Sequence, residues 1–150
     1  MKYITKITAI FSLLMMFNLY THAQVKHPHV IHRRYSLKSA IISGQKVYAD
    51  NCLSCHQADG GGIPNMNPPL IKTEYIMGDK TRLIKIVLNG FNENVEINGN
   101  TYSNNMPSHD YLTDQQIANV LTYVRNSFGN KAPHITTAQV KAVRAVNKKP

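Results

Sequence analysis

Two cysteines and a histidine stand in one five-residue run, Cys52-Leu53-Ser54-Cys55-His56. This order and spacing is typical of c-type haem attachment, in which both thiols add to the haem vinyl groups as thioethers. The two residues between the thiols set a turn that matches the separation of the vinyl groups, and the adjacent imidazole is placed to bind the iron. We therefore predict that Cys52 and Cys55 hold one haem c covalently and that His56 is its proximal iron ligand.

Three other uses of these cysteines fit the sequence less well. A disulfide needs no histidine after the second cysteine, and a thioredoxin-like redox pair needs a βαβ context that this chain lacks. A structural zinc site needs further ligands, and the chain contains only 2 cysteines. Because the predicted attachment uses both thiols, no disulfide is left to stabilise a small domain, and a buried haem would supply the missing apolar core.

The formal net charge of +9 is distributed unevenly along the 150 residues. Residues 40–128 carry six basic side chains and all 8 acidic ones, a net of −2, whereas residues 24–39 carry four basic side chains and residues 129–150 carry five, with no acid in either segment. The basic character therefore belongs to the two ends. No nucleic-acid-binding motif is present, so we exclude nucleic acid and favour peripheral contact with an anionic membrane or an acidic redox partner.

The first 23 residues have the pattern of a secretory signal peptide. Lys2 and Lys6 precede a mostly apolar run over residues 7–20, and Thr21-His22-Ala23 offers small residues for cleavage. An uncleaved membrane anchor is the alternative, for which the run is short and interrupted by polar residues. Both interpretations predict an exported, periplasmic domain, in agreement with the c-type haem.

Residues 24–39 are polar and basic and show no helical period, which predicts a flexible arm. The arm contains His27, His29 and His32, whose spacing is compatible with a metal site. Solvated side chains are the simpler interpretation of three histidines in a flexible segment, and we favour it.

From residue 40 the apolar positions follow a helical period, with one face formed by Ile41, Gly44, Val47 and Tyr48. Glycine inside a helix costs about 1 kcal/mol relative to alanine, which favours a close helix crossing at Gly44 over a simple weak point. After the cysteine run, three glycines and three prolines in residues 57–70 predict a loop. This loop can wrap the proximal edge of a haem and give a carbonyl to the histidine, or it can be a plain surface loop.

Capping residues and apolar periods predict three further helices. Gly78-Asp79 begins the first, Gly90 ends it, and its apolar positions are Leu83, Ile84, Val87 and Leu88. Thr113 and Gln116 form a capping box for the second, which is expected to end at Gly129, with Ile117, Val120, Leu121, Val124 and Phe128 on its buried side. Between these two helices, Asn98-Gly99 predicts a tight turn that joins short extended pieces at 95–97 and 101–102.

The third helix lies in the basic C-terminal extension. Thr136 and Gln139 repeat the capping-box pattern, and the apolar face that follows consists of Val140, Val143 and Val146. Lys141 and Arg144 are expected to face outward. We favour a strap folded back on the domain, and the alternative is an amphipathic contact element for a membrane or partner.

A low-spin, electron-carrying haem needs a second axial ligand opposite His56. Five side chains after the cysteine run are candidates: Met66, Met77, Met106, His109 and His134. A thioether raises the reduction potential and a second imidazole lowers it. Met66 is too near the cysteine run to reach the opposite face easily, and Met77 suits core packing. Met106 lies in a polar loop where packing does not explain it, so the chemistry favours Met106 without excluding the others.

The order of these motifs resembles the class I cytochrome c family over about residues 40 to 128. The matching motifs are the helix with Gly44 and Tyr48, the cysteine run, Pro68-Pro69-Leu70, Met106-Pro107 and the helix at 112–125. The resemblance implies an all-α fold, with three core helices, short connecting helices and loops around one covalent haem. It places Gly44 and Tyr48 against Val120, Tyr123 or Val124. It also implies Met106 as the second iron ligand, the Pro68 carbonyl as acceptor for the proximal imidazole, and Leu70 in contact with the haem.

We therefore predict a signal peptide (1–23), a basic arm (24–39), a cytochrome c domain (40–129) and a basic extension (130–150). The resemblance implies an electron carrier, not an enzyme, that passes single electrons between redox partner proteins in a respiratory chain. Similar domains are also modules of oxidases, nitrite reductases and quinoprotein dehydrogenases, so a permanently docked haem subunit is the alternative. A third possibility is a peroxidase or gas-binding protein with an open sixth site, for which His109 is the candidate distal group.

Overall fold

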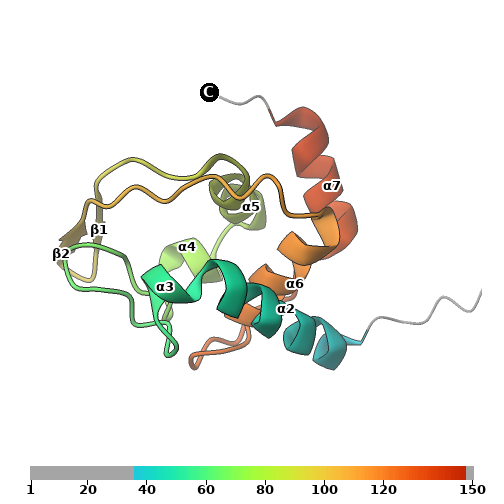
Figure 1. The fold of residues 1–150 in the computed structure, drawn as a ribbon, viewed down its shortest axis with the longest axis horizontal. Helices are drawn as coiled ribbons and strands as arrows, with labels where there is room; N and C mark the ends of the chain where they lie inside the picture. Colours follow the sequence, from blue (N-terminus) through green and yellow to red (C-terminus); the bar gives the residue numbers. More distant parts are fainter. Residues whose placement is uncertain (1–35, 148–150) are drawn as a thin grey trace, which may run out of the picture. The chain divides into compact units, whose positions relative to one another are not determined.

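The computed structural model describes residues 36–147. The predicted signal peptide, most of the predicted arm with its three histidines, and the last three residues lie outside this range. Within it, the chain is mostly helical (Figure 1), which confirms the all-α class. The elements are α2 (Leu37–Asn51), α3 (Leu53–His56), α4 (Glu74–Met77), α5 (Lys80–Asn89), β1 (Val95–Ile97), β2 (Asn100–Tyr102), α6 (Asp114–Val124) and α7 (Thr137–Val146). Among the described residues, no helix has the length and apolar character needed to cross a membrane.

Helices α2 and α6 cross in direct contact at Gly44. A Cβ atom at this position would lie 2.1 Å from the backbone oxygen of Asn119 and 2.7 Å from Cβ of Tyr123. Only glycine therefore permits this approach, which confirms the predicted close crossing. The prediction named Tyr123 among the residues that contact Gly44, but it did not name the backbone of Asn119. One turn further on, the Tyr48 ring packs on the Tyr123 ring with centroids 5.4 Å apart.

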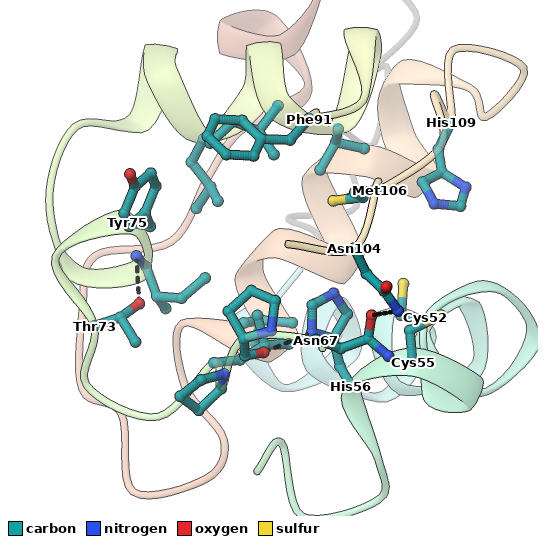
Figure 2. Close-up of a pocket in the computed structure, with 18 of the residues that line it drawn as sticks. Cys52, Cys55, His56, Asn67, Thr73, Tyr75, Phe91, Asn104, Met106 and His109 are labelled. Carbon is teal, nitrogen blue, oxygen red and sulfur yellow. Dashed lines mark hydrogen bonds between the residues drawn. The ribbon is translucent and has the colours of Figure 1, made fainter. Parts of the chain in front are cut away.

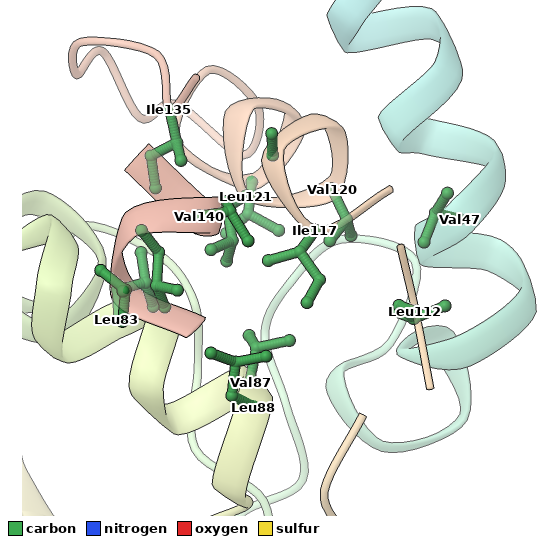
Figure 3. Close-up of a cluster of buried hydrophobic side chains, with 14 of the residues drawn as sticks. Val47, Leu83, Val87, Leu88, Leu112, Ile117, Val120, Leu121, Ile135 and Val140 are labelled. Atoms are coloured by element: carbon green, nitrogen blue, oxygen red, sulfur yellow. The ribbon is translucent and has the colours of Figure 1, made fainter. Parts of the chain in front are cut away.

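The hydrophobic core lies between α5, α6 and α7 (Figure 3) and reaches α2 through Val47 and Tyr48. The apolar faces predicted for α5 and α6 are buried there, consisting of Leu83, Ile84, Val87, Leu88, Ile117, Val120, Leu121 and Val124. In α7, Val140 and Val143 are buried as expected, but Val146 is 74% exposed. Val146 is the last residue of the helix.

The helices begin directly after the residues that cap them. Thr113 and Thr136 form complete capping boxes with Gln116 and Gln139, and the Asp79 carboxylate caps α5. The start of α2 differs from the prediction, because the Ser36 hydroxyl accepts from the Ser39 N–H and the helix begins at Leu37, inside the predicted arm. Helix α4 was not predicted, although Thr73 caps it in the same way.

The end of α6 also differs from the prediction. The helix ends at Val124, not near Phe128, and the chain then enters left-handed backbone at Phe128 (φ 57°) and Gly129 (φ 79°). Arg125, the residue after Val124, is 2% exposed and points inward. Its guanidinium donates to the backbone carbonyls of Ile76, Gly78 and Pro133. Because it lies in the protein interior, its pKa falls below the usual arginine range.

The C-terminal extension forms the strap. Val140 is fully buried, and α7 packs against α5 and α6. Arg144 does not face outward as predicted, because its Nε donates to the Asp114 carboxylate at 2.6 Å. The short hairpin agrees with its prediction, since Asn98 (φ 53°) and Gly99 (φ 77°) form the turn between β1 and β2.

Candidate haem site

All six residues predicted to form the site line one cavity: Cys52, Cys55, His56, Pro68, Leu70 and Met106. Figure 2 shows that His56 and the cysteines come from the α3 side of this cavity and Met106 from the loop opposite. Apolar side chains complete the walls: Ile86 and Val87 of α5, Phe91 from the segment after it, Ile97 of the hairpin and Val120 of α6. The six predicted residues thus share one cavity, whereas most of its apolar wall was not predicted from the sequence.

The cysteine run is held by the end of α2 and the single turn of α3. Cys52 follows the last residue of α2, and its N–H donates to the Tyr48 carbonyl at 2.8 Å. The His56 N–H donates to the Cys52 carbonyl at 2.9 Å, so this turn places both cysteines and the imidazole on the same cavity. Burial, with a smaller effect of the neighbouring Cys55, raises the pKa of the free Cys52 thiol to about 11.

The His56 ring is oriented by the loop that follows it. Its Nδ1 lies 3.0 Å from the Pro68 carbonyl oxygen, which can only accept, so Nδ1 carries the proton and Nε2 is left for a metal. Burial lowers the pKa of His56, against the opposing effect of this hydrogen bond. The imidazole is therefore neutral at neutral pH, which is the form that binds iron.

The loop at 57–70 is built to present the Pro68 carbonyl. The Gly62 N–H donates to the His56 carbonyl at 3.1 Å, and the Leu70 N–H donates to the Gly60 carbonyl at 2.8 Å. Gly62 has φ 70°, and a Cβ there would lie 2.3 Å from the Asn67 carbonyl oxygen. The loop folds around the histidine through its own backbone, and it is not a plain surface loop.

Met106 is held on the other side of the cavity by a two-way backbone pairing with Phe91. The Phe91 N–H donates to the Met106 carbonyl at 2.9 Å, and the Met106 N–H donates to the Phe91 carbonyl at 2.8 Å. The Met106 side chain is half-buried and packs against the hydrophobic core. Its thioether is thus available to a group inside the cavity.

The other candidate ligands differ in whether they line the cavity. Met66 is 48% exposed, Met77 packs against the core, and His134 is exposed, and none of these three lines the cavity. His109 does line it. The Tyr111 hydroxyl donates to Asn51 Oδ1, so it accepts from His109 Nδ1 at 2.9 Å, which leaves Nε2 of the neutral His109 ring as an acceptor.

The donor set and the walls fit a c-type haem. Two thiols at the vinyl spacing, a neutral imidazole and a facing thioether are the groups that attach and coordinate such a haem. The largely apolar walls match its porphyrin plate. Among the described residues, no cluster of three or more histidine, cysteine or acidic side chains suits a separate metal ion.

Comparison with known proteins agrees with this chemistry. The family model of cytochrome c matches residues 41–128. Cytochrome c-552 of Thermus thermophilus is 34% identical over 118 residues, covering 73% of this chain and 79% of that protein. The cytochrome c subunit of the quinone-dependent alcohol dehydrogenase of Gluconacetobacter polyoxogenes is 34% identical over 102 residues, and that of the gluconate 2-dehydrogenase of Pantoea cypripedii is 35% identical over 100.

The match to the dehydrogenase subunits is partial: it covers 67% and 65% of this chain but only 22% of each subunit. Fold and site define an all-α protein that holds a haem by covalent attachment. The chain belongs to the cytochrome c family. Its cofactor is a c-type haem.

Proposed function

We propose that the protein is an exported carrier of single electrons with one haem, attached through Cys52 and Cys55 and coordinated by His56 and Met106. The main support is that the neutral imidazole of His56 and the thioether of Met106 enter one apolar cavity from opposite walls. The haem supplies a one-electron iron couple whose potential depends on its axial ligands. If His56 and Met106 both bind the iron, they would leave no position open for a substrate, which supports a carrier over a peroxidase or gas-binding protein.

The surrounding residues keep this geometry constant. The Pro68 carbonyl fixes the plane and the protonation of the His56 ring. Leu70, half-buried against the core, covers one wall and helps to exclude water. The Met106 loop is tied to Phe91 by two hydrogen bonds. A rigid, dry site changes little between oxidation states, which is what a carrier needs.

The test is a pair of visible spectra for the wild-type holoprotein and Met106→Ala, each in both redox states. We expect the substitution to abolish the methionine-to-iron charge-transfer band and to open the iron to added imidazole. Met66→Ala, which removes a methionine outside the cavity, is the matched control and should leave the band intact. An unchanged spectrum in Met106→Ala would refute this ligand assignment and direct attention to His109.

We further propose that the protein works as a free carrier between redox partner oxidoreductases of a respiratory chain. The alignment covers most of cytochrome c-552 but only a small part of each dehydrogenase subunit, which supports a separate carrier. Export is supported by the signal pattern at 1–23 and by the cofactor class. The basic ends suit contact with an acidic partner or an anionic membrane.

Permanent docking on a dehydrogenase is the second candidate function, favoured by the similarity to the two dehydrogenase subunits. The size of the native material distinguishes the two functions. A monomer in the native extract supports the free carrier, whereas co-elution of the haem with a larger oxidoreductase supports the docked subunit.

A further inference from the structure

The segment that carries Met106 is fastened from outside the family's shared domain. The family match ends at residue 128, whereas Arg144 lies in α7, within the extension. Its Nη1 donates to the Asp110 carbonyl at 2.9 Å and its Nη2 to the Leu112 carbonyl at 2.7 Å. These two carbonyls lie four and six residues after Met106, at the point where the loop enters α6.

The same guanidinium also holds the first residue of α6. Nε of Arg144 donates to Asp114 Oδ1 at 2.6 Å, and the two side chains are only 33% and 24% exposed. Hydrogen bonds to a charged donor are roughly twice as strong as neutral ones, and partial burial reduces screening by salt. Arg144 therefore joins α7 to the loop and to the start of α6 through three directed bonds, unlike an ordinary surface ion pair.

A second contact reaches the segment of Phe91, which pairs with Met106 through the backbone. Asn147 and Asn89 exchange two side-chain hydrogen bonds, of 3.2 and 2.7 Å between nitrogen and oxygen. Asn89 is the last residue of α5 and precedes Phe91 by two positions. Because Phe91 pairs with Met106 through the backbone, α7 anchors both segments of that pairing.

We propose that Arg144 is a positioning residue for the iron ligand: together with Asn147, it makes α7 a clamp that keeps the Met106 loop closed over the haem cavity. This inference rests on the proposed coordination by Met106. In this arrangement the extension tunes how often the thioether leaves the iron and how easily another ligand enters. The buried apolar face of α7 supplies the attachment, and the guanidinium supplies the restraint on the loop.

Titration of the ferric holoprotein with imidazole, followed by loss of the methionine-to-iron band, tests the proposal. Loss of the Arg144 hydrogen bonds should favour the open loop, so Arg144→Gln should lower the half-saturating imidazole concentration by about tenfold. Arg144→Lys keeps the charge but not the planar, forked guanidinium. Its half-saturating imidazole concentration should therefore lie between those of the wild type and Arg144→Gln. Lys141→Gln is the matched control, because it removes an exposed positive charge from the same helix and should match the wild type.

A urea titration of each variant separates loop opening from global unfolding. A variant that unfolds at lower urea but binds imidazole like the wild type would overturn the proposal, since Arg144 would then only stabilise the domain. Equal imidazole affinity in Arg144→Gln and Lys141→Gln would also overturn it. If Arg144→Gln does not fold, Asn147→Ala tests the milder contact, with an expected shift of about threefold, and no shift there refutes the clamp.

The spectra of Met106→Ala test the ligand assignment, and the imidazole titrations of the α7 variants test the clamp, so failure of one can be distinguished from failure of the other. If Met106→Ala keeps the charge-transfer band, the proposed coordination fails and the clamp fails with it. If Met106→Ala loses the band while the α7 variants behave as the wild type, only the clamp is wrong.

Discussion

The two sides of the haem cavity are held in different ways. On the cysteine side, the contacts that place the thiols and the imidazole join residues close in sequence, from Tyr48 to Pro68. On the methionine side, Met106 depends on Phe91, and its loop is tied to α5 and to α7. The cysteine side is therefore a local motif, whereas the methionine side forms only when distant segments have assembled.

This difference has a consequence for the chemistry. Covalent attachment and the proximal ligand need only the turn of α3 and the loop after it, so they tolerate changes elsewhere in the chain. In the coordination proposed above, the bond from the Met106 thioether is the one that long-range packing can strengthen or weaken. Reduction potential and ligand entry should therefore respond to mutations far from the iron mainly through Met106.

The largest expected effect comes from breaking the local motif itself. Replacing Cys52 and Cys55 together by alanine should abolish covalent attachment, because no thiol is left to form a thioether. Mass spectrometry of protein matured in a host that attaches c-type haem measures this directly, and the expected mass is that of the polypeptide alone. Ser54→Ala keeps both thiols and should retain the added haem mass. A haem that stays attached in the double variant would contradict the motif.

The cysteine side of the site could be predicted from the sequence more completely than the methionine side. The cysteine run and the Gly44 crossing could be predicted because each depends on short spacings or on one residue type that has no substitute. Chemistry alone favoured Met106 without excluding the other candidates, and the resemblance to a family strengthened the assignment. The pairing of Met106 with Phe91 has no local signal. The outward direction predicted for Arg144 was wrong for the same reason. Its three acceptors lie at 110–114, and a helical period in α7 carries no information about them.

Two glycines offer a matched test of the two sides. Gly62 has φ 70° and would bring a Cβ within 2.7 Å of the Pro68 carbonyl oxygen; Gly90 has φ 79° and would bring one within 2.5 Å of the Met106 carbonyl oxygen. Gly99 has a similar φ of 77° with no atom within 4 Å of a Cβ. Alanine at Gly62 or Gly90 should therefore cost about 2–3 kcal/mol of unfolding free energy, against about 1 kcal/mol at Gly99.

Urea unfolding of the three holoprotein variants measures these costs, and the spectra assign them to a side. Gly90→Ala should also weaken the methionine-to-iron band, because the strain falls on the segment that carries the thioether. Gly62→Ala should keep the band, since its strain falls on the proximal loop. If both variants lose the band to the same extent, the cysteine side and the methionine side of the cavity form one cooperative unit and are not held independently.

The smallest expected effect concerns a side-chain bond that joins the two sides. Asn104 Nδ2, in the segment before Met106, donates to Asn67 Oδ1, next to Pro68, at 3.2 Å. Asn67 is 8% exposed, whereas Asn104 is exposed, so water can replace part of this bond when it is broken. A double-mutant cycle with Asn67→Ala and Asn104→Ala should therefore give a coupling energy of only about 0.5–1 kcal/mol.

The backbone bond from the Asn104 N–H to the Met66 carbonyl, at 3.2 Å, persists in all four proteins of this cycle, so the cycle isolates the amide pair. Asn105→Ala, an exposed neighbour, is the control and should show no coupling to Asn67. A coupling well above 1 kcal/mol would mean that the proximal loop and the methionine segment support each other directly. In that case the dependence of Met106 on α5 and α7 would be shared with the cysteine side, and mutations at Asn67 should shift imidazole affinity as those at Arg144 do.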